Sequence, residues 1–234
     1  MKSESGKKLT EPKDILKEET IFYSKLYTSS KPKKQDVDKY LIHTTFEKKL
    51  TDVEKQKCEG SLSLEECSEA VAKMKKNKAP GMDGLCCEFY QTFWDIIKKI
   101  VVASLNEGYE KGEFSKTQRH GILTLLYKKG DIEQLGNWRP ITLLNVDVKI
   151  GGYVLAKRLQ MILGKIINVD QSGYIKNRYI GLNIRLIEDI IEYSDKLEID
   201  SAILFLDFKK AFDMVEWNFM LSVLEYFGLT EDHL

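Results

Sequence analysis

Six apolar side chains recur at helical spacing between residues 87 and 105. Their intervals of three and four residues place them on one face of a single helix of roughly five turns. Such a face has to be covered by other elements, so the stripe predicts a core built around one long helix. The six residues are Cys87, Tyr90, Trp94, Ile97, Val101 and Leu105.

Periodicity and capping residues predict further helices. They cover residues 11–27, a segment that begins after Ser63, and residues 146–167, 180–197 and 217–227. Within 146–167 we expect the inward positions to be Val148, Leu155, Leu159 and Ile162. Residues 1–9 are polar and are expected to be frayed, and the lysine-rich residues 29–60 are expected to form a linker with short helical pieces.

Two short apolar runs predict β-strands, so the expected fold class is α+β. Residues 121–127 are bounded by glycine and charge. Residues 202–206 are continuously apolar, which predicts a strand buried on both faces, and Asp207 follows directly. A carboxylate there lies at the rim of a sheet, where metals and ligands can reach it. Taken alone, Asp207 is equally typical of a turn or of a helix cap.

Composition limits the class of protein. Lysine plus arginine equals aspartate plus glutamate, at 36 each, so the chain lacks the overall basic charge of many nucleic-acid binders. Residues 141–187 nevertheless hold seven basic side chains and only two acids, and this stretch is either a phosphate-facing surface or an ordinary solvated one. The four cysteines lack metal-site spacing, and no run approaches the roughly 18 apolar residues of a membrane span. We therefore expect a protein without a membrane contact, in a reducing nuclear or cytoplasmic compartment.

Four strings along the chain carry the functional signal. They are Lys78-Ala-Pro-Gly-Met-Asp83-Gly84, Asn137-Trp-Arg139-Pro140-Ile-Thr-Leu-Leu-Asn145, Asp170-Gln171-Ser-Gly173-Tyr174, and Ile203-Leu-Phe-Leu-Asp207-Phe-Lys-Lys-Ala-Phe212-Asp213. In this order and at these separations they resemble the reverse transcriptase domain of non-LTR, LINE-type retrotransposons. Thr142 and Tyr174 stand where that family more often has serine and phenylalanine. The resemblance covers about residues 61–234, and the segment 22–27 resembles the part that precedes the polymerase.

The resemblance implies an incomplete right-hand polymerase fold. Residues 1–60 would be a helix and linker that precede the polymerase. Residues 61–200 would be helix-rich fingers with a short β-sheet and the start of the palm. Residues 201–234 would hold the first palm strand and the helix after it. The implied activity is template-directed dNTP addition by two-metal phosphoryl transfer, with Mg²⁺ as cofactor and RNA template, DNA primer and dNTP as partners. The oligomeric state is not indicated.

The last string would hold the catalytic centre. By resemblance, the carboxylate of Asp207 and the backbone carbonyl of Phe208 supply oxygen ligands to Mg²⁺. Phe212 would act as a steric gate that excludes a 2′-hydroxyl by a clash. Gln171, from the third string, would lie near the template and the incoming nucleotide.

Basic residues of the other strings would meet phosphate. Arg139 would clamp the triphosphate with its planar guanidinium fork, and Lys128 would add a point charge, although Lys129 remains an alternative to Lys128. Lys78, Lys176 and Arg178 would contact the nucleic acid, and such contacts give affinity without sequence choice.

The sequence contains no Ala-Asp-Asp string, which the resemblance would place well after Asp207. We therefore expect the chain alone to lack polymerase activity, and its unpaired strand at 202–207 to favour association or poor solubility. Two other hypotheses stay open: a nucleic-acid-binding remnant without catalysis, and an unrelated α+β interaction domain. Salt-dependent binding of a primer–template would separate these two.

Overall fold

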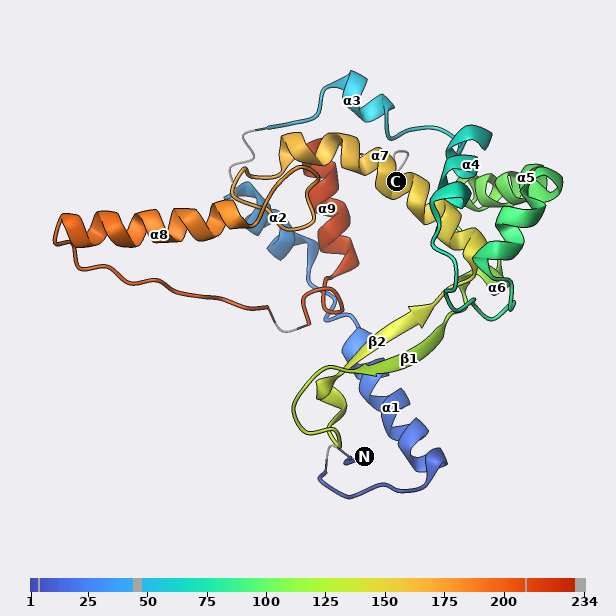
Figure 1. Cartoon of the computed structure of the whole chain (residues 1–234), viewed down its shortest axis with the longest axis horizontal. Coiled ribbons are helices and arrows are strands. Elements are labelled where there is room, and N and C mark those ends of the chain that lie inside the picture. The colour runs from blue at the N-terminus through green and yellow to red at the C-terminus, as the bar shows by residue number, and fades with distance from the viewer. Residues whose placement is uncertain (4, 44–47, 209, 230–234) are drawn as a thin grey trace. The chain divides into compact units, whose positions relative to one another are not determined.

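The computed structural model describes residues 1–3, 5–43, 48–208 and 210–229 (Figure 1). These residues divide into two compact units. Unit 1 comprises Met1–Thr28 and Gly60–Ala156, and unit 2 comprises Ser29–Glu59 and Lys157–Leu234. The boundaries predicted at residues 60 and 200 follow the family strings, whereas the two units are defined by contacts within each unit. These boundaries therefore stay a prediction. Lys209 and residues 230–234, which belong to the predicted palm segment, lie outside the described ranges.

The elements agree with the predicted helices and with one of the two predicted strands. Unit 1 holds α1 (Pro12–Tyr27), α4 (Leu64–Lys73), α5 (Cys87–Glu110), α6 (Lys116–Arg119), β1 (Ile122–Tyr127), the 3-10 turn η1 (Leu135–Asn137), β2 (Trp138–Leu143) and the first half of α7 (Val146–Ile166). Unit 2 holds α2 (Lys34–Ile42), α3 (Asp52–Gln56), the second half of α7, α8 (Gly181–Lys196) and α9 (Trp217–Phe227). The helix-rich α+β class is thus confirmed, whereas the palm assignment stays a proposal.

The core of unit 1 forms around α5, as its apolar stripe predicts. Helix α4 packs against it, and α4 begins with the expected capping box, in which Ser63 and Glu66 each accept from the other's backbone N–H. The buried core residues are Leu62, Cys67, Ala70, Val71, Tyr90, Leu105, Val146, Ile150 and Val154. Of the positions predicted to face inward in α7, Ile162 is buried, and Leu155 and Leu159 are partly buried and pack against the two cores. Val148 is also only partly buried, and Ile150 and Val154, which were not predicted, are buried.

Strands β1 and β2 form an antiparallel ribbon with register Ile122↔Leu143 to Tyr127↔Trp138. The second strand was missed from sequence because Arg139 and Pro140 interrupt its apolar pattern, and proline disfavours a central strand. Strand β2 has a neighbouring strand on one side only, so Pro140 is tolerated there although it has no backbone N–H to donate. Helix α1 lies beside the ribbon (Figure 1), and its buried Tyr23 donates a hydrogen bond to the Trp138 carbonyl at 3.5 Å.

The N-terminal residues are not frayed, which corrects the expectation for 1–9. Lys2 and Lys8 form an isolated β-bridge, and Lys2 N–H donates to the Glu133 carbonyl at 2.7 Å. The Lys2 ammonium lies 3.3 Å from Asp131 and 3.0 Å from Glu133. Polar composition alone misled here, because the acids that hold these lysines lie more than a hundred residues away in sequence.

The core of unit 2 forms where the second half of α7 meets the segments around α3 and α9. Its buried members are Leu50, Cys58, Ile162, Ile166 and Leu229. Helix α9 ends as predicted at Gly228, which adopts the left-handed conformation with φ of 96° and donates its N–H back to the last turn. Across the described residues, every helix is too short or too polar to cross a membrane.

The prediction of a buried strand at 202–206 is wrong. These residues have no regular secondary structure, and Leu204, Phe205 and Leu206 are 77–79% exposed. A strand gains its hydrogen bonds only from a neighbour, and within the described ranges the sole ladder joins β1 to β2. Helix α8 is present as predicted, but none of its residues is buried.

Candidate nucleotide and nucleic-acid interface

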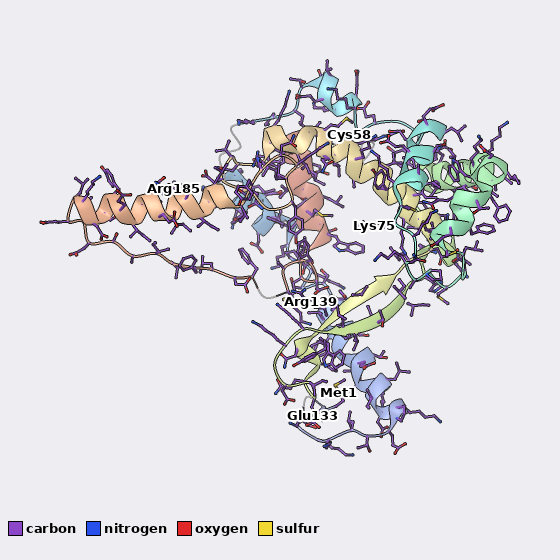
Figure 2. All side chains as sticks on the ribbon, viewed as in Figure 1. Met1, Cys58, Lys75, Glu133, Arg139 and Arg185 are labelled. Atoms are coloured by element: carbon purple, nitrogen blue, oxygen red, sulfur yellow. The ribbon has the colours of Figure 1, made fainter. Side chains whose placement is uncertain are left out.

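The β1–β2 ribbon of unit 1 carries the two basic residues predicted to bind a triphosphate. Leu126 is paired with Arg139, and Lys128 N–H donates to the Asn137 carbonyl at 3.0 Å, which extends the ladder by one residue. Side chains alternate along a strand and paired residues share a face, so Lys128 falls on the same face as Leu126 and Arg139. Both basic side chains are exposed, and no described residue forms an ion pair with either. Figure 2 labels Arg139. The register favours Lys128 over Lys129, which lies beyond the last joined pair.

The first and second strings meet at Asn145. Loop 77–84 lies so close to it that a β-carbon on Gly81 would be 2.1 Å from Asn145 Oδ1 and 2.6 Å from the Leu144 carbonyl carbon. The buried Asn145 side chain accepts from Asp83 N–H at 3.4 Å and donates to the Thr117 carbonyl at 3.2 Å. Only glycine permits this approach of two backbones, so the glycine of the loop and the asparagine that ends the second string form one joint.

Polar groups beneath this joint are satisfied internally. Buried Gln118 donates to Asp147 at 3.0 Å, and Tyr90 lies close to both Asp147 and Asp83. Burial, followed by the charges of Asp147 and Asp83, raises the pKa of Tyr90 above its ordinary value. Tyr90 is therefore a neutral phenol in the core at neutral pH.

In unit 2, the third string forms a turn that is held by Arg178. The guanidinium donates to the carbonyls of Gly164 at 3.2 Å, Ile167 at 3.1 Å and Gln171 at 2.8 Å, and also to that of Asn168. A cation over the last carbonyls of a helix is favourable because it meets the negative end of the helix dipole. With four N–H groups used in this way, Arg178 is occupied in this structure, and its predicted template contact stays a prediction.

The other two polar residues of this turn that were predicted to contact nucleotide or nucleic acid are accessible. Gln171 is exposed, and its Nε2 donates to the Gly173 carbonyl at 3.3 Å. Lys176 is exposed, and its ammonium has no ion-pair partner among the described residues. Lys176 is therefore the better candidate of the two basic residues for contact with phosphate.

The third and fourth strings meet through an aromatic pair. The rings of Tyr174 and Phe212 lie edge to face, with centroids 5.7 Å apart and an interplanar angle of 84°. Tyr174 adopts a positive φ of 62°, and both rings are more than 80% exposed. The structure thus brings the predicted steric-gate residue next to the turn that carries Gln171.

The residues present do not by themselves fit a magnesium site. Asp207 and Phe208 are both exposed. In the described part of the chain no three side chains of the His, Cys, Asp or Glu type gather closely enough to hold a metal ion. One carboxylate and one backbone carbonyl are fewer oxygen ligands than a divalent ion requires. Asp207 and the Phe208 carbonyl alone are therefore too few ligands to hold Mg²⁺.

The basic stretch 141–187 is largely used inside the protein. Arg158 is buried and donates to the Glu59 carbonyl at 3.1 Å, Lys165 pairs with Glu54, and Arg185 lies 2.8 Å from Asp189. Lys157 also has a partner, so together with Arg178 five of its seven cations have partners within the protein. Its surplus charge therefore overstates the phosphate-binding surface. Sequence reasoning assigned no role in the site to Asn145, although its place at the end of a family string was an available signal.

Comparison with known proteins supports the resemblance. The family profile described as reverse transcriptase (RNA-dependent DNA polymerase) matches residues 126–233. The Transposon TX1 uncharacterized 149 kDa protein of Xenopus laevis is 34% identical over 226 residues, which are 97% of this chain and 17% of that protein. The Retrovirus-related Pol polyprotein from type-1 retrotransposable element R2 of Popillia japonica is 28% identical over 156 residues, which are 67% of this chain and 21% of that protein. The Probable RNA-directed DNA polymerase from transposon X-element of Drosophila melanogaster is 27% identical over 186 residues, which are 72% of this chain and 20% of that protein.

The chain belongs to the reverse transcriptase family, whose members are RNA-directed DNA polymerases and hence nucleotidyltransferases. Its relatives from the R1, R2 and TX1 elements place it with the non-LTR, LINE-type retrotransposons. The chain spans 17–21% of the length of the three relatives described above. The substrates, partners and activity of such whole proteins are therefore not assigned to this chain by similarity alone.

Proposed function

We propose that this chain provides the fingers and the first part of the palm of an RNA-directed DNA polymerase that adds dNTPs to a DNA primer on an RNA template. The observation that carries this proposal is the β1–β2 ribbon, on which Lys128 and Arg139 share one exposed face and are free of described acidic partners. Two cations held at neighbouring positions on a ladder are suited to an anion with several phosphate groups. In this role Arg139 pairs with two phosphate oxygens and Lys128 adds a single charge.

Phe212 would limit the sugar that enters, with Tyr174 as its support. Contact with Tyr174 restricts the orientations of the Phe212 ring. The ring would then be held in the position where it clashes with a 2′-hydroxyl. Asp207 and the Phe208 carbonyl would supply two of the oxygen ligands for Mg²⁺, and further carboxylates would complete the site. The chain by itself would then bind nucleotide without incorporating it.

Nucleotide binding tests the proposal with a matched pair of variants. Lys128→Gln and Lys129→Gln remove the same charge from adjacent residues, but only Lys128 shares the face of Arg139. A charge-assisted hydrogen bond contributes roughly 1.5–3 kcal/mol, so Lys128→Gln and Arg139→Gln should each raise the Kd for a fluorescent dNTP by roughly 10- to 100-fold. Lys129→Gln should change it little, and an equal loss in both lysine variants would contradict the assignment.

A nucleic-acid-binding protein without catalysis is the second candidate. It is favoured by the observation that the described residues bring no three metal-ligating side chains together. The dNTP-binding measurement separates the two ideas, because only the polymerase proposal requires Lys128 and Arg139 to bind a dNTP. Primer extension with magnesium or manganese tests both. Robust incorporation by the purified chain would exclude the second candidate and would also overturn the proposal that the chain alone is inactive.

A further inference from the structure

Three lysines lie close together in the segment that joins α4 to loop 77–84, and the nucleotide-binding proposal uses none of them. Lys75, Lys76 and Lys78 are all exposed (Figure 2 labels Lys75), and no described residue forms an ion pair with any of the three. The preceding Lys73 differs, because its ammonium pairs with Glu69 at 2.6 Å. Three cations thus remain available where α4 has ended.

The backbone under these lysines is fixed at both ends. At the α4 end, Gln91 Nε2 on α5 donates to the carbonyls of Val71 at 2.9 Å and Met74 at 3.0 Å. In the middle, Asn77 N–H donates to Glu88 Oε1 at 2.5 Å, and Asn77 adopts a positive φ of 58°. At the far end, Gly81 is packed against Asn145. A cationic segment on a fixed backbone loses less conformational entropy on binding than one on a mobile loop.

Local acids do not cancel this charge. Glu69 is occupied by Lys73, and the Glu88 carboxylate accepts the Asn77 amide, which together with its other hydrogen bonds and the Lys76 charge lowers the pKa of Glu88. Counting Glu88 and Asp83 of the same loop, three lysines against two carboxylates leave a surplus of one positive charge. This surplus contrasts with the basic stretch 141–187, in which most cations already have partners.

We propose that Lys75, Lys76 and Lys78 form a strip that binds the phosphate backbone of a nucleic-acid strand without reading its bases. Ammonium groups are point charges that attract phosphates whatever the base sequence. The three residue steps from 75 to 78 span at most about 10 Å, which matches roughly three nucleotides of a stacked strand at about 3.4 Å each. This inference rests on the proposed function, and it extends the nucleic-acid contact predicted for Lys78 to Lys75 and Lys76.

The test measures binding of a fluorescein-labelled single-stranded RNA of mixed sequence as a function of salt. The variant carries Lys75→Gln, Lys76→Gln and Lys78→Gln. The slope of log K against log salt is negative, and each lost phosphate contact should make it less steep by about 0.7, so three lost contacts reduce its magnitude by about 2. The ratio of variant to wild-type Kd should then shrink about 20-fold when KCl rises from about 50 to about 200 mM.

Two control variants keep the result interpretable. Lys7→Gln, Lys13→Gln and Lys17→Gln remove the same charge from exposed lysines around α1 and should leave the slope unchanged. Arginine at positions 75, 76 and 78 keeps the charge and should keep the slope, while weak binding by that variant would refute a charge-based role. If the wild-type chain binds RNA but the glutamine variant keeps its slope, the strip is wrong and the proposed function stands. If the wild-type chain fails to bind RNA at any salt concentration, the proposed function itself fails.

Discussion

Replacing Gly81 with alanine should destabilise unit 1 strongly, although it adds only one methyl group. The new β-carbon would lie 2.1 Å from Asn145 Oδ1, 2.4 Å from Asn145 N and 2.6 Å from the carbonyl carbon of Leu144. Two of these three atoms belong to the backbone at the start of α7, so a rotamer change cannot relieve the clash. Overpacking by a methylene typically costs about 1–3 kcal/mol, and we expect Gly81→Ala to lie at the upper end, near 3 kcal/mol.

Urea unfolding measures this change if the signal comes from unit 1 alone. Trp94 and Trp138 lie in unit 1, and Trp217, in unit 2, is 78% exposed. A Trp217→Phe background therefore makes tryptophan fluorescence report on unit 1 with little structural cost. The change in unfolding free energy follows from the shift in midpoint at constant slope.

Two comparisons make the Gly81 result decisive. Gly152→Ala adds the same methyl group in α7, where nothing lies within 4 Å of the new β-carbon, and should stabilise the protein by about 0.5–1 kcal/mol. Adding Asn145→Ala to Gly81→Ala should not restore stability, because the backbone contacts remain. A Gly81→Ala protein within about 0.5 kcal/mol of wild type would refute the close approach of loop 77–84 to Asn145.

Three further predictions concern unit 2. Arg178→Ala should lower the unfolding free energy of unit 2 by about 2 kcal/mol in urea melts, because it removes hydrogen bonds to four carbonyls. Arg178→Lys should recover only part of this loss. Unchanged stability together with weakened RNA binding would instead favour a phosphate contact. Asp207→Ala should leave primer–template affinity within about 2-fold of wild type in fluorescence anisotropy, since a metal-binding carboxylate adds nothing to phosphate attraction, and a large loss would argue against that role. Glu216 accepts hydrogen bonds from the hydroxyls of Ser29 and Ser30 and from the Ser30 amide, and these lower its pKa below the ordinary 4.5. The attachment of residues 29–30 to Glu216 should therefore persist above pH 4.5 and be lost as the pH falls through the lowered pKa. As the pH is lowered, hydrogen exchange of the Ser30 amide should accelerate more in the wild type than in the Glu216→Gln variant. The same pH dependence in both proteins would contradict this prediction.

Helix positions were predictable because the interactions that form a helix are local. The stripe from Cys87 to Leu105, the capping box of Ser63 and Glu66, and the glycine after Phe227 each act within a few residues, and each is confirmed. Strands were less predictable. Ile122–Tyr127 forms β1 beside a partner with a weak strand pattern, whereas the more apolar residues 202–206 form no strand, because pairing depends on a segment elsewhere.

The candidate site divides in the same way. The family strings, and with them Asp207, Arg139 and Phe212, were identifiable from residue order alone. The sequence did not show which basic side chains are available to bind phosphate. Arg178 and Lys165 have the same charge as Lys128 and Lys176, but Arg178 is held by carbonyls and Lys165 by a carboxylate from other segments. The contact of Gly81 with Asn145, 64 residues apart in number, was equally invisible.

By itself, then, the sequence determined the helices and the family of this protein, because both are written in patterns of neighbouring residues. Only the tertiary structure decided which strand found a partner and which basic side chains remain free. Those outcomes depend on groups brought together from distant parts of the chain, and the free energy of a charge or a strand edge is set by what lies against it in space.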